Sequence, residues 1–283
     1  MRSNVCSPTL EGVSRAERIT QVADRGTSAE RQRLDAQIRP VTLAGTRCLP
    51  VSSGLEGLFP QGGLQRGATV VVSADHGVQG ATTLGLALGA AASSAGAWCA
   101  AVAFPDLGLA MAAELGITLR RLALVPDVGP REWVTVVGAL LDAVDLVMVR
   151  PPAHLRAGDA RRLATRARER GTVLVPILGH PYRTPAVGAW SGGADLRLCV
   201  SDAAWEGPGG GEGRLLSRRI TVTTTGRGAA ARERQAEVWL PAPEGGIRAG
   251  AQITAQRPAF AGSDADLLPD ATHTAPRVLR TAG

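Results

Sequence analysis

The sequence contains 283 residues, 45% of them hydrophobic but only 3% aromatic, so its core must be built from aliphatic side chains. All 31 basic residues are arginine, and against 25 acidic residues they give a net charge of +6. A basic chain suits anionic partners such as nucleic acid, although an arginine-rich composition throughout gives the same charge. No apolar run approaches the ~18 residues of a membrane-spanning helix and no apolar signal core is present, so we expect a cytoplasmic protein rather than a membrane protein.

Residues 1–44 are polar and rich in arginine and glutamate. Ser28 is a candidate N-cap, and Leu34 and Ile38 share one helical face. Because this apolar stripe is thin, we expect a helical or flexible segment that docks on the main domain or on a partner. The following residues, 45–66, predict an extended piece, an apolar anchor and a glycine turn that leads into the first core strand.

A strand, a loop of small residues, a helix and a second strand follow one another from residue 67 to residue 103. The apolar run 68–72 predicts the first strand, 83–93 the helix and 98–103 the second strand. This order is the frame of a phosphate-binding loop, in which backbone N–H groups and a helix N-terminus face an anion.

The loop departs from the motif GxxxxGK[ST] in its charged position. Its residues are Asp75 where the first glycine belongs, Gly77, Gly80, Ala81 in place of lysine, and then Thr82 and Thr83. No lysine elsewhere can take over, because the chain has none. Two readings remain open: the loop retains anion binding, or its glycines simply permit a tight turn before threonines that begin a helix well.

Beyond this region, apolar runs alternate with amphipathic segments. Helices are predicted at 107–115, 132–141 and 159–169, and strands at 122–125, 146–149 and 172–177. This alternation predicts βαβ units with a mostly parallel sheet. Residues 178–195 predict an irregular loop, 196–200 a strand and 205–213 a flexible turn. The segments 215–225 and 237–240 then predict a half-exposed antiparallel ribbon, and 258–283 a disordered tail.

The four cysteines, Cys6, Cys48, Cys99 and Cys199, are scattered and form no CxxC pair. Cys99 and Cys199 lie in apolar runs typical of strands. We therefore expect buried, reduced thiols rather than disulfides or a zinc site, and we predict no bound metal.

Taken in order, several stretches resemble the core of RecA and, more particularly, the RecA-like ImuA group of bacterial damage-induced mutagenesis. They are SSGLEGLFPQGGLQRG, GATT, LGLAMAAELGI, DLVMVRPPA, TVLVPILGHP, RRITVTTTGRG and RQAEVWLPAPEGGI. The resemblance covers roughly residues 50–247. It implies an α/β, RecA-like P-loop core over 45–257, with a mostly parallel central sheet, helices on both faces and an antiparallel edge ribbon.

The departures from an active RecA-like ATPase concern charge. Besides Ala81, the Walker B position after 145–149 holds Arg150 where a carboxylate would help to place Mg²⁺. The acid nearest to the expected catalytic carboxylate is Asp106, in a shifted register. Arg150 can pair with Asp106 or with Asp145, and the sequence does not decide between them. Losing these electrostatic elements together predicts a pseudo-ATPase without catalytic residues and without a cofactor.

The resemblance places a DNA-holding loop at 178–195. Its candidate contact residues are His180, Tyr182, Arg183 and Trp190, since an aromatic ring beside an arginine can stack on a base and neutralise phosphate. An ordinary irregular loop fits the same residues equally well.

By resemblance, we expect a non-catalytic adaptor in DNA repair, acting in SOS-type translesion synthesis. Its implied partners are a Y-family polymerase homologue of the ImuB type, an error-prone C-family polymerase, and DNA as an option. The alternative is a DNA-dependent ATPase or recombinase-like repair protein that uses ATP and Mg²⁺ at an atypical site. The expected location is cytoplasmic, with association with the nucleoid as an option.

Overall fold

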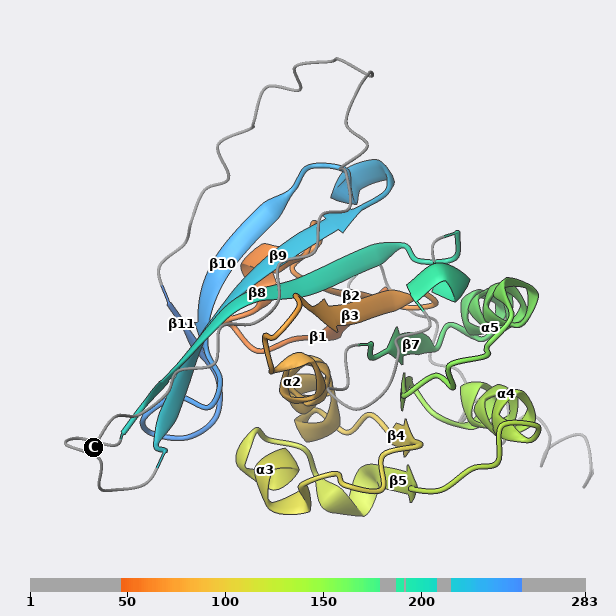
Figure 1. Ribbon diagram of the computed structural model, residues 1–283, viewed down its shortest axis with the longest axis horizontal. Helices are drawn as coiled ribbons and strands as arrows, with labels where there is room; N and C mark the ends of the chain where they lie inside the picture. Colours follow the sequence, from red (N-terminus) through yellow and green to blue (C-terminus); the bar gives the residue numbers. More distant parts are fainter. Residues whose placement is uncertain (1–46, 179–186, 191, 208–214, 251–283) are drawn as a thin grey trace, which may run out of the picture.

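The computed structural model describes residues 47–178, 187–190, 192–207 and 215–250, and two sheets joined edge to edge run through this part of the chain (Figure 1). One has the strand order β5-β4-β6-β7 and is parallel, and the other has the order β11-β10-β9-β8-β3. Parallel bridges from Thr69 to Leu174 and from Val72 to Ile177 connect β3 with β7. The strands are β1 (Cys48–Pro50), β2 (Gly63–Gln65), β3 (Val70–Ala74), β4 (Cys99–Val102), β5 (Leu122–Val125), β6 (Leu146–Val149), β7 (Val173–Pro176), β8 (Leu196–Glu206), β9 (Ser217–Gly226), β10 (Arg234–Trp239) and β11 (Arg248–Ala249).

Strand β3 lies at the junction of the two sheets and has parallel neighbours on both sides. From β8 outward the pairing becomes antiparallel through β9, β10 and β11. The α/β fold and the antiparallel ribbon predicted from the sequence are therefore confirmed. Strands β1 and β2 pair with each other in a separate antiparallel hairpin before β3, which the sequence had indicated only as an extended piece.

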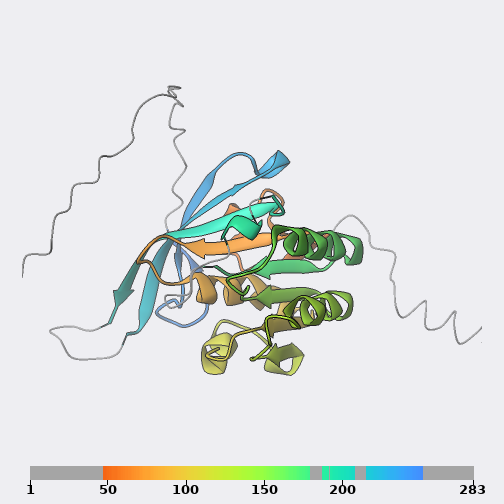
Figure 2. The same cartoon turned by 45° about the vertical axis from the view of Figure 1, so that its right-hand side comes forward.

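Helices cover both faces of the sheet (Figures 1 and 2). The described α-helices are α2 (Ala81–Ser94), α3 (Leu109–Glu114), α4 (Trp133–Ala143) and α5 (Ala157–Arg170). Short 3-10 turns are η2 (Glu56–Leu58), η3 (Leu119–Arg121), η4 (Val187–Trp190) and η5 (Gly228–Ala230). Helices α2 and α3 pack in one hydrophobic cluster, and α4, α5 and η4 pack in another.

The two clusters follow from the alternation of side chains along a strand. On β6, Leu146 and Met148 join the cluster of α2, while Val147 and Val149 join the cluster of α4 and α5. Every residue of β4, β6 and β7 is buried, as expected for parallel strands covered by helices on both sides. The packing of these side chains fixes where each strand lies in the sheet. It thereby also fixes the position of the loops at the carboxyl ends of the strands.

Helix α2 is apolar on nearly all sides, because it lies between the sheet and α3. Gly85 is required there, since an added Cβ would lie 2.2 Å from Cδ1 of Ile177. Helix α5 is the opposite case, with Ala160, Leu163, Ala164 and Ala167 buried and arginines on its outer side. That outer face agrees with a solvated helix surface.

The main difference from the predicted elements concerns β8. The sequence predicted a strand over 196–200 and a flexible turn from residue 205, whereas β8 continues to Glu206. The antiparallel partner β9 supplies the hydrogen bonds for this extension, with Glu206 opposite Ser217, and a register shift lies between Val200 and Asp202. As a result, β8 and β9 project past the end of β3, where the loop to α2 begins.

The predicted N-terminal segment 1–44, the tail 258–283 and Cys6 lie outside the described residues. Cys99 is buried, whereas Cys48 and Cys199 are partly buried and all three are free thiols. None of the described helices has the length and hydropathy that a bilayer-spanning helix needs.

We expect Cys99 to resist alkylation in the folded protein. Burial raises the pKa of its thiol to about 11, with the charge of Asp145 adding to the effect, and the thiolate is the reactive form. Iodoacetamide at mildly alkaline pH, read out by mass spectrometry, should label Cys48 well before Cys99 in native protein and both thiols in denaturant. Equal native labelling of Cys99 and Cys48 would contradict the buried position on β4.

Candidate functional site

The loop between β3 and α2 lies at the carboxyl end of a parallel strand, the edge at which α/β proteins bind ligands. The N–H of Asp75 donates to the carbonyl of Val200 at 2.9 Å, which ties the loop to β8. The N–H of Val78 donates to the carbonyl of Asp75 at 3.0 Å and closes a tight turn. Gly77 and Gly80 have φ angles of 80° and 133°, so both use backbone conformations that side chains disfavour.

Helix α2 begins at Ala81 directly after Gly80, and no side chain caps its N-terminus. Its first turn also carries no acidic residue. The N-terminal N–H groups of a helix have no partner inside the helix and carry partial positive charge. Ala81 itself is buried in the core, and Thr82 and Thr83 are partly buried. The loop therefore leads into an uncapped helix N-terminus and has a buried alanine where the motif GxxxxGK[ST] has lysine.

Asp75, at the place of the motif's first glycine, is held against β8. The thiol of Cys199 donates a hydrogen bond to Oδ1 of Asp75 at 3.1 Å. Burial raises the pKa of this thiol, and the hydrogen bond to Asp75 adds to the effect, so Cys199 stays a neutral donor. The carboxylate of Asp75 thus has a partner on the strand beside the loop.

Arg150 lies at the carboxyl end of β6 and pairs with Asp106, which follows β4. Its Nη1 lies 2.8 Å from Oδ1 of Asp106, and its guanidinium lies 4.6 Å from the ring of Phe104. The arginine side chain is only 9% exposed, and that of Asp106 is 56% exposed. Asp145 instead pairs with Arg66 at 2.9 Å. The structure thus decides between the two partners that the sequence left open, and an ion pair stands where the motif needs a metal-binding carboxylate.

A further arginine, Arg218 on β9, lies against the loop and was not singled out from the sequence. It is 5% exposed, its Nε donates to the carbonyl of Leu240 at 3.1 Å, and its guanidinium lies 4.9 Å from the ring of Trp205. A Cβ built on Gly80 would lie 3.5 Å from its Nη2, which places the guanidinium at the N-terminus of α2. Among the described residues Nη2 has no hydrogen-bond partner although it is buried, and burial lowers the pKa of the guanidinium.

A signal for Arg218 was present in the sequence. The alternation over residues 219–223 places Ile220 and Val222 on the inner face of the ribbon, and the same parity places Arg218 there. The alternation gives the face of a residue but not what lies opposite it, because that depends on how far β8 and β9 extend beyond β3.

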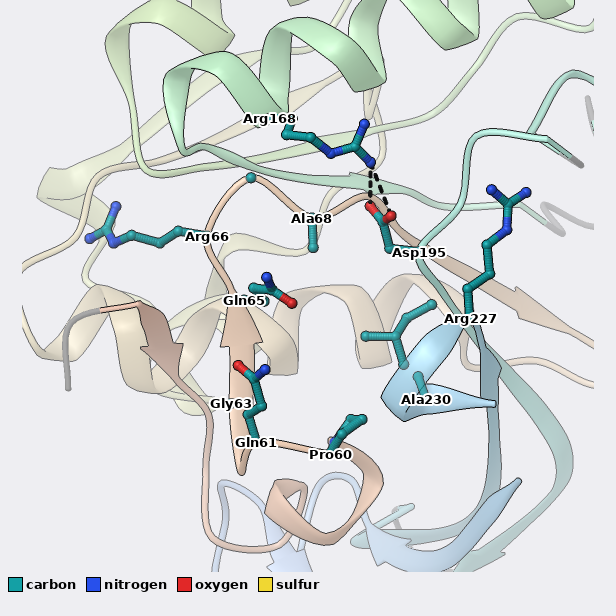
Figure 3. A pocket seen from close by; sticks show the side chains of 12 residues that line it. Pro60, Gln61, Gly63, Gln65, Arg66, Ala68, Arg168, Asp195, Arg227 and Ala230 are labelled. Carbon is teal, nitrogen blue, oxygen red and sulfur yellow. Dashed lines mark hydrogen bonds and ion pairs between the residues drawn. The ribbon is translucent and has the colours of Figure 1, made fainter. Parts of the chain in front are cut away.

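A cavity of about 240 Å³ lies at the other end of β3, near its amino terminus (Figure 3). Arg168 pairs with Asp195 inside it at 3.0 Å, and Asp195 also accepts the N–H of Thr69 at 2.9 Å. Arg227 donates to the carbonyl of Gly192 at 3.0 Å. Since these charged side chains hold segments of the chain together, we interpret the cavity as part of the scaffold and place the candidate site at the loop.

The predicted DNA-contact residues divide into two groups. His180, Tyr182 and Arg183 lie outside the described residues. Trp190, on η4, is 0% exposed and packs in the cluster of α4 and α5, so its ring has no open face for a base. The expectation of a stacking role for Trp190 is corrected by this position.

The fold and site define an α/β protein with a glycine-containing loop at the N-terminus of a buried helix. A family model, MT3502 N-terminal domain, matches residues 57–182. The uncharacterized protein Rv3395c of Mycobacterium tuberculosis (strain ATCC 25618 / H37Rv) is 32% identical over 157 residues, which cover 53% of this chain and 72% of that protein. The chain therefore belongs to the family of this mycobacterial protein. The residues matched by the family model include the loop and Arg150 but end before Arg218.

Proposed function

We propose that this protein is a non-catalytic RecA-fold adaptor in damage-induced translesion synthesis. Its core would hold surfaces that bring polymerase components together rather than hydrolyse a nucleotide. By the sequence resemblance, these components are an ImuB-type homologue of Y-family polymerases and an error-prone C-family polymerase. The protein would work in the cytoplasm at damaged DNA.

The arrangement around β3 supports the RecA-like part of this proposal. The strand has parallel neighbours, its carboxyl end opens into a glycine-containing loop, and the loop leads directly into a helix covered by the core. The helices on both faces and the antiparallel ribbon beyond β8 agree with the same core. The match to the mycobacterial family is consistent with the resemblance.

The pair of Arg150 with Asp106 is the observation that carries the non-catalytic part. Mg²⁺ in phosphoryl transfer is held by oxygen ligands, commonly with one or two carboxylates. Here a buried guanidinium at the end of β6 occupies that neighbourhood and engages the nearest acid. A buried cation at this position repels Mg²⁺, because its low-dielectric surroundings screen the charge less than water does. Together with the buried Ala81, it removes the charge pattern that hydrolysis needs.

We expect purified protein to show no Mg²⁺-dependent ATP hydrolysis above buffer, with or without single-stranded DNA. Changing Thr82 to alanine should leave damage-induced mutagenesis in cells unchanged, because no metal would depend on its hydroxyl. Thr83→Ala is the matched control, since it alters the same helix turn. Hydrolysis by wild-type protein, together with loss of mutagenesis in a folded Thr82→Ala variant but not in Thr83→Ala, would favour the DNA-dependent ATPase instead.

A further inference from the structure

Arg218 is a buried positive charge that has no acidic partner among the described residues. Its Nε is satisfied by the carbonyl of Leu240 and one face of the guanidinium lies against Trp205. No salt bridge is formed by Arg218 within the described part of the chain. Burying an ion is costly unless it is paired, so an anion next to this guanidinium would be stabilising.

The N-terminus of α2, next to this guanidinium, would also be stabilised by an anion. Its first-turn amides carry the positive end of the helix dipole, no side chain of the described residues caps them, and the first turn holds no acidic residue. The guanidinium of Arg218 lies beside Gly80, because a Cβ built on this glycine would be in van der Waals contact with it. A cation next to a helix N-terminus is unfavourable by itself, but an anion bound by both would stabilise both.

We propose that the loop residues Gly80–Thr82 and Arg218 form a binding site for a phosphate group, held without a metal ion. The oxygens of a phosphate accept hydrogen bonds from helix N-terminal amides and from the planar fork of a guanidinium. Arg218 thus supplies, from β9, a charge that the loop itself lacks. The phosphate belongs to a nucleotide or to the end of a nucleic acid strand. This site is independent of the adaptor role, since neither polymerase contact nor hydrolysis enters the argument.

The test measures thermal stability against inorganic phosphate, with chloride added to keep the ionic strength constant. A ligand that binds only the folded state raises the melting temperature in a saturable way. We expect this rise for wild-type protein and for Arg219→Met, which changes the exposed neighbour of Arg218. In Arg218→Met the affinity should fall by about ten- to a hundredfold, the usual effect of losing a hydrogen bond to a charged group.

Arg218→Lys provides a second variant, because it keeps the charge and loses the fork; it should retain a weakened phosphate response. The source of the phosphate is distinguished by comparing AMP with adenosine, and a 5′-phosphorylated oligonucleotide with its 5′-hydroxyl form. Stabilisation by the phosphorylated member of either pair supports the site and names the source. No phosphate-dependent stabilisation of wild-type protein, or an equal one in folded Arg218→Met, would overturn it.

Discussion

Replacing Trp190 by alanine is expected to lower the free energy of unfolding by about 3–5 kcal/mol. The side chain is fully buried and packs in the cluster that joins α4 and α5 to the sheet. Removing the ring therefore forfeits its transfer from water and leaves a cavity that the surrounding helices can fill only in part. Urea unfolding followed by circular dichroism measures the loss as a lower midpoint at an unchanged slope.

Trp98→Ala is the matched control, because Trp98 is 47% exposed and contacts the guanidinium of Arg121 at 6.0 Å from its ring. We expect it to cost less than about 1 kcal/mol. Trp190→Phe should cost less than Trp190→Ala, since it keeps an aromatic ring and removes an indole N–H that has no partner. If Trp190→Ala left stability unchanged and weakened DNA binding, the stacking role predicted for the loop would be restored.

The fold could be predicted from the sequence because its strands are marked by apolar runs of the right length. Residues 146–149, for example, form β6 over the predicted range. A strand that is buried on both faces is apolar at every position, so the apolar run and the strand have the same ends. The end of β8 could not be predicted in the same way. Residues 201–206 carry mixed side chains, and their strand conformation depends on pairing with β9, a contact between distant segments.

The candidate site was predicted only where it is local in sequence. The loop from Asp75 to Thr83 follows from the motif and its spacing, and its geometry agrees with a strand-to-helix turn. The partner of Arg150 depended on which acid the folded chain brings near β6, which only the packing of the β4 segment decides. Arg218 was missed because the motif concerns contiguous residues, whereas this side chain reaches the loop from a strand far along the chain.

Breaking the ion pair between Arg150 and Asp106 at the end of β6 is expected to destabilise the fold. Arg150→Met should lower the free energy of unfolding by about 1–3 kcal/mol, through the lost hydrogen bond to a charged group and the lost contact with Phe104. Asp106→Asn should cost a similar amount, because it leaves the buried guanidinium without its acid.

A double-mutant cycle tests whether the two residues act on each other. The variant carrying both changes should cost less than the sum of the single changes by about 1 kcal/mol, because the second change removes a partner already lost. Arg162 with Asp159, an exposed pair on α5, is the matched control, and its coupling should be below about 0.5 kcal/mol. If the cycle at Arg150 and Asp106 showed no coupling, the two residues would not form a stabilising ion pair. The proposal that this ion pair replaces a metal-binding carboxylate would then be contradicted. Ala81 would then be the remaining departure from a hydrolytic site, and Mg²⁺-dependent nucleotide binding by Arg150→Met would be the measurement to make next.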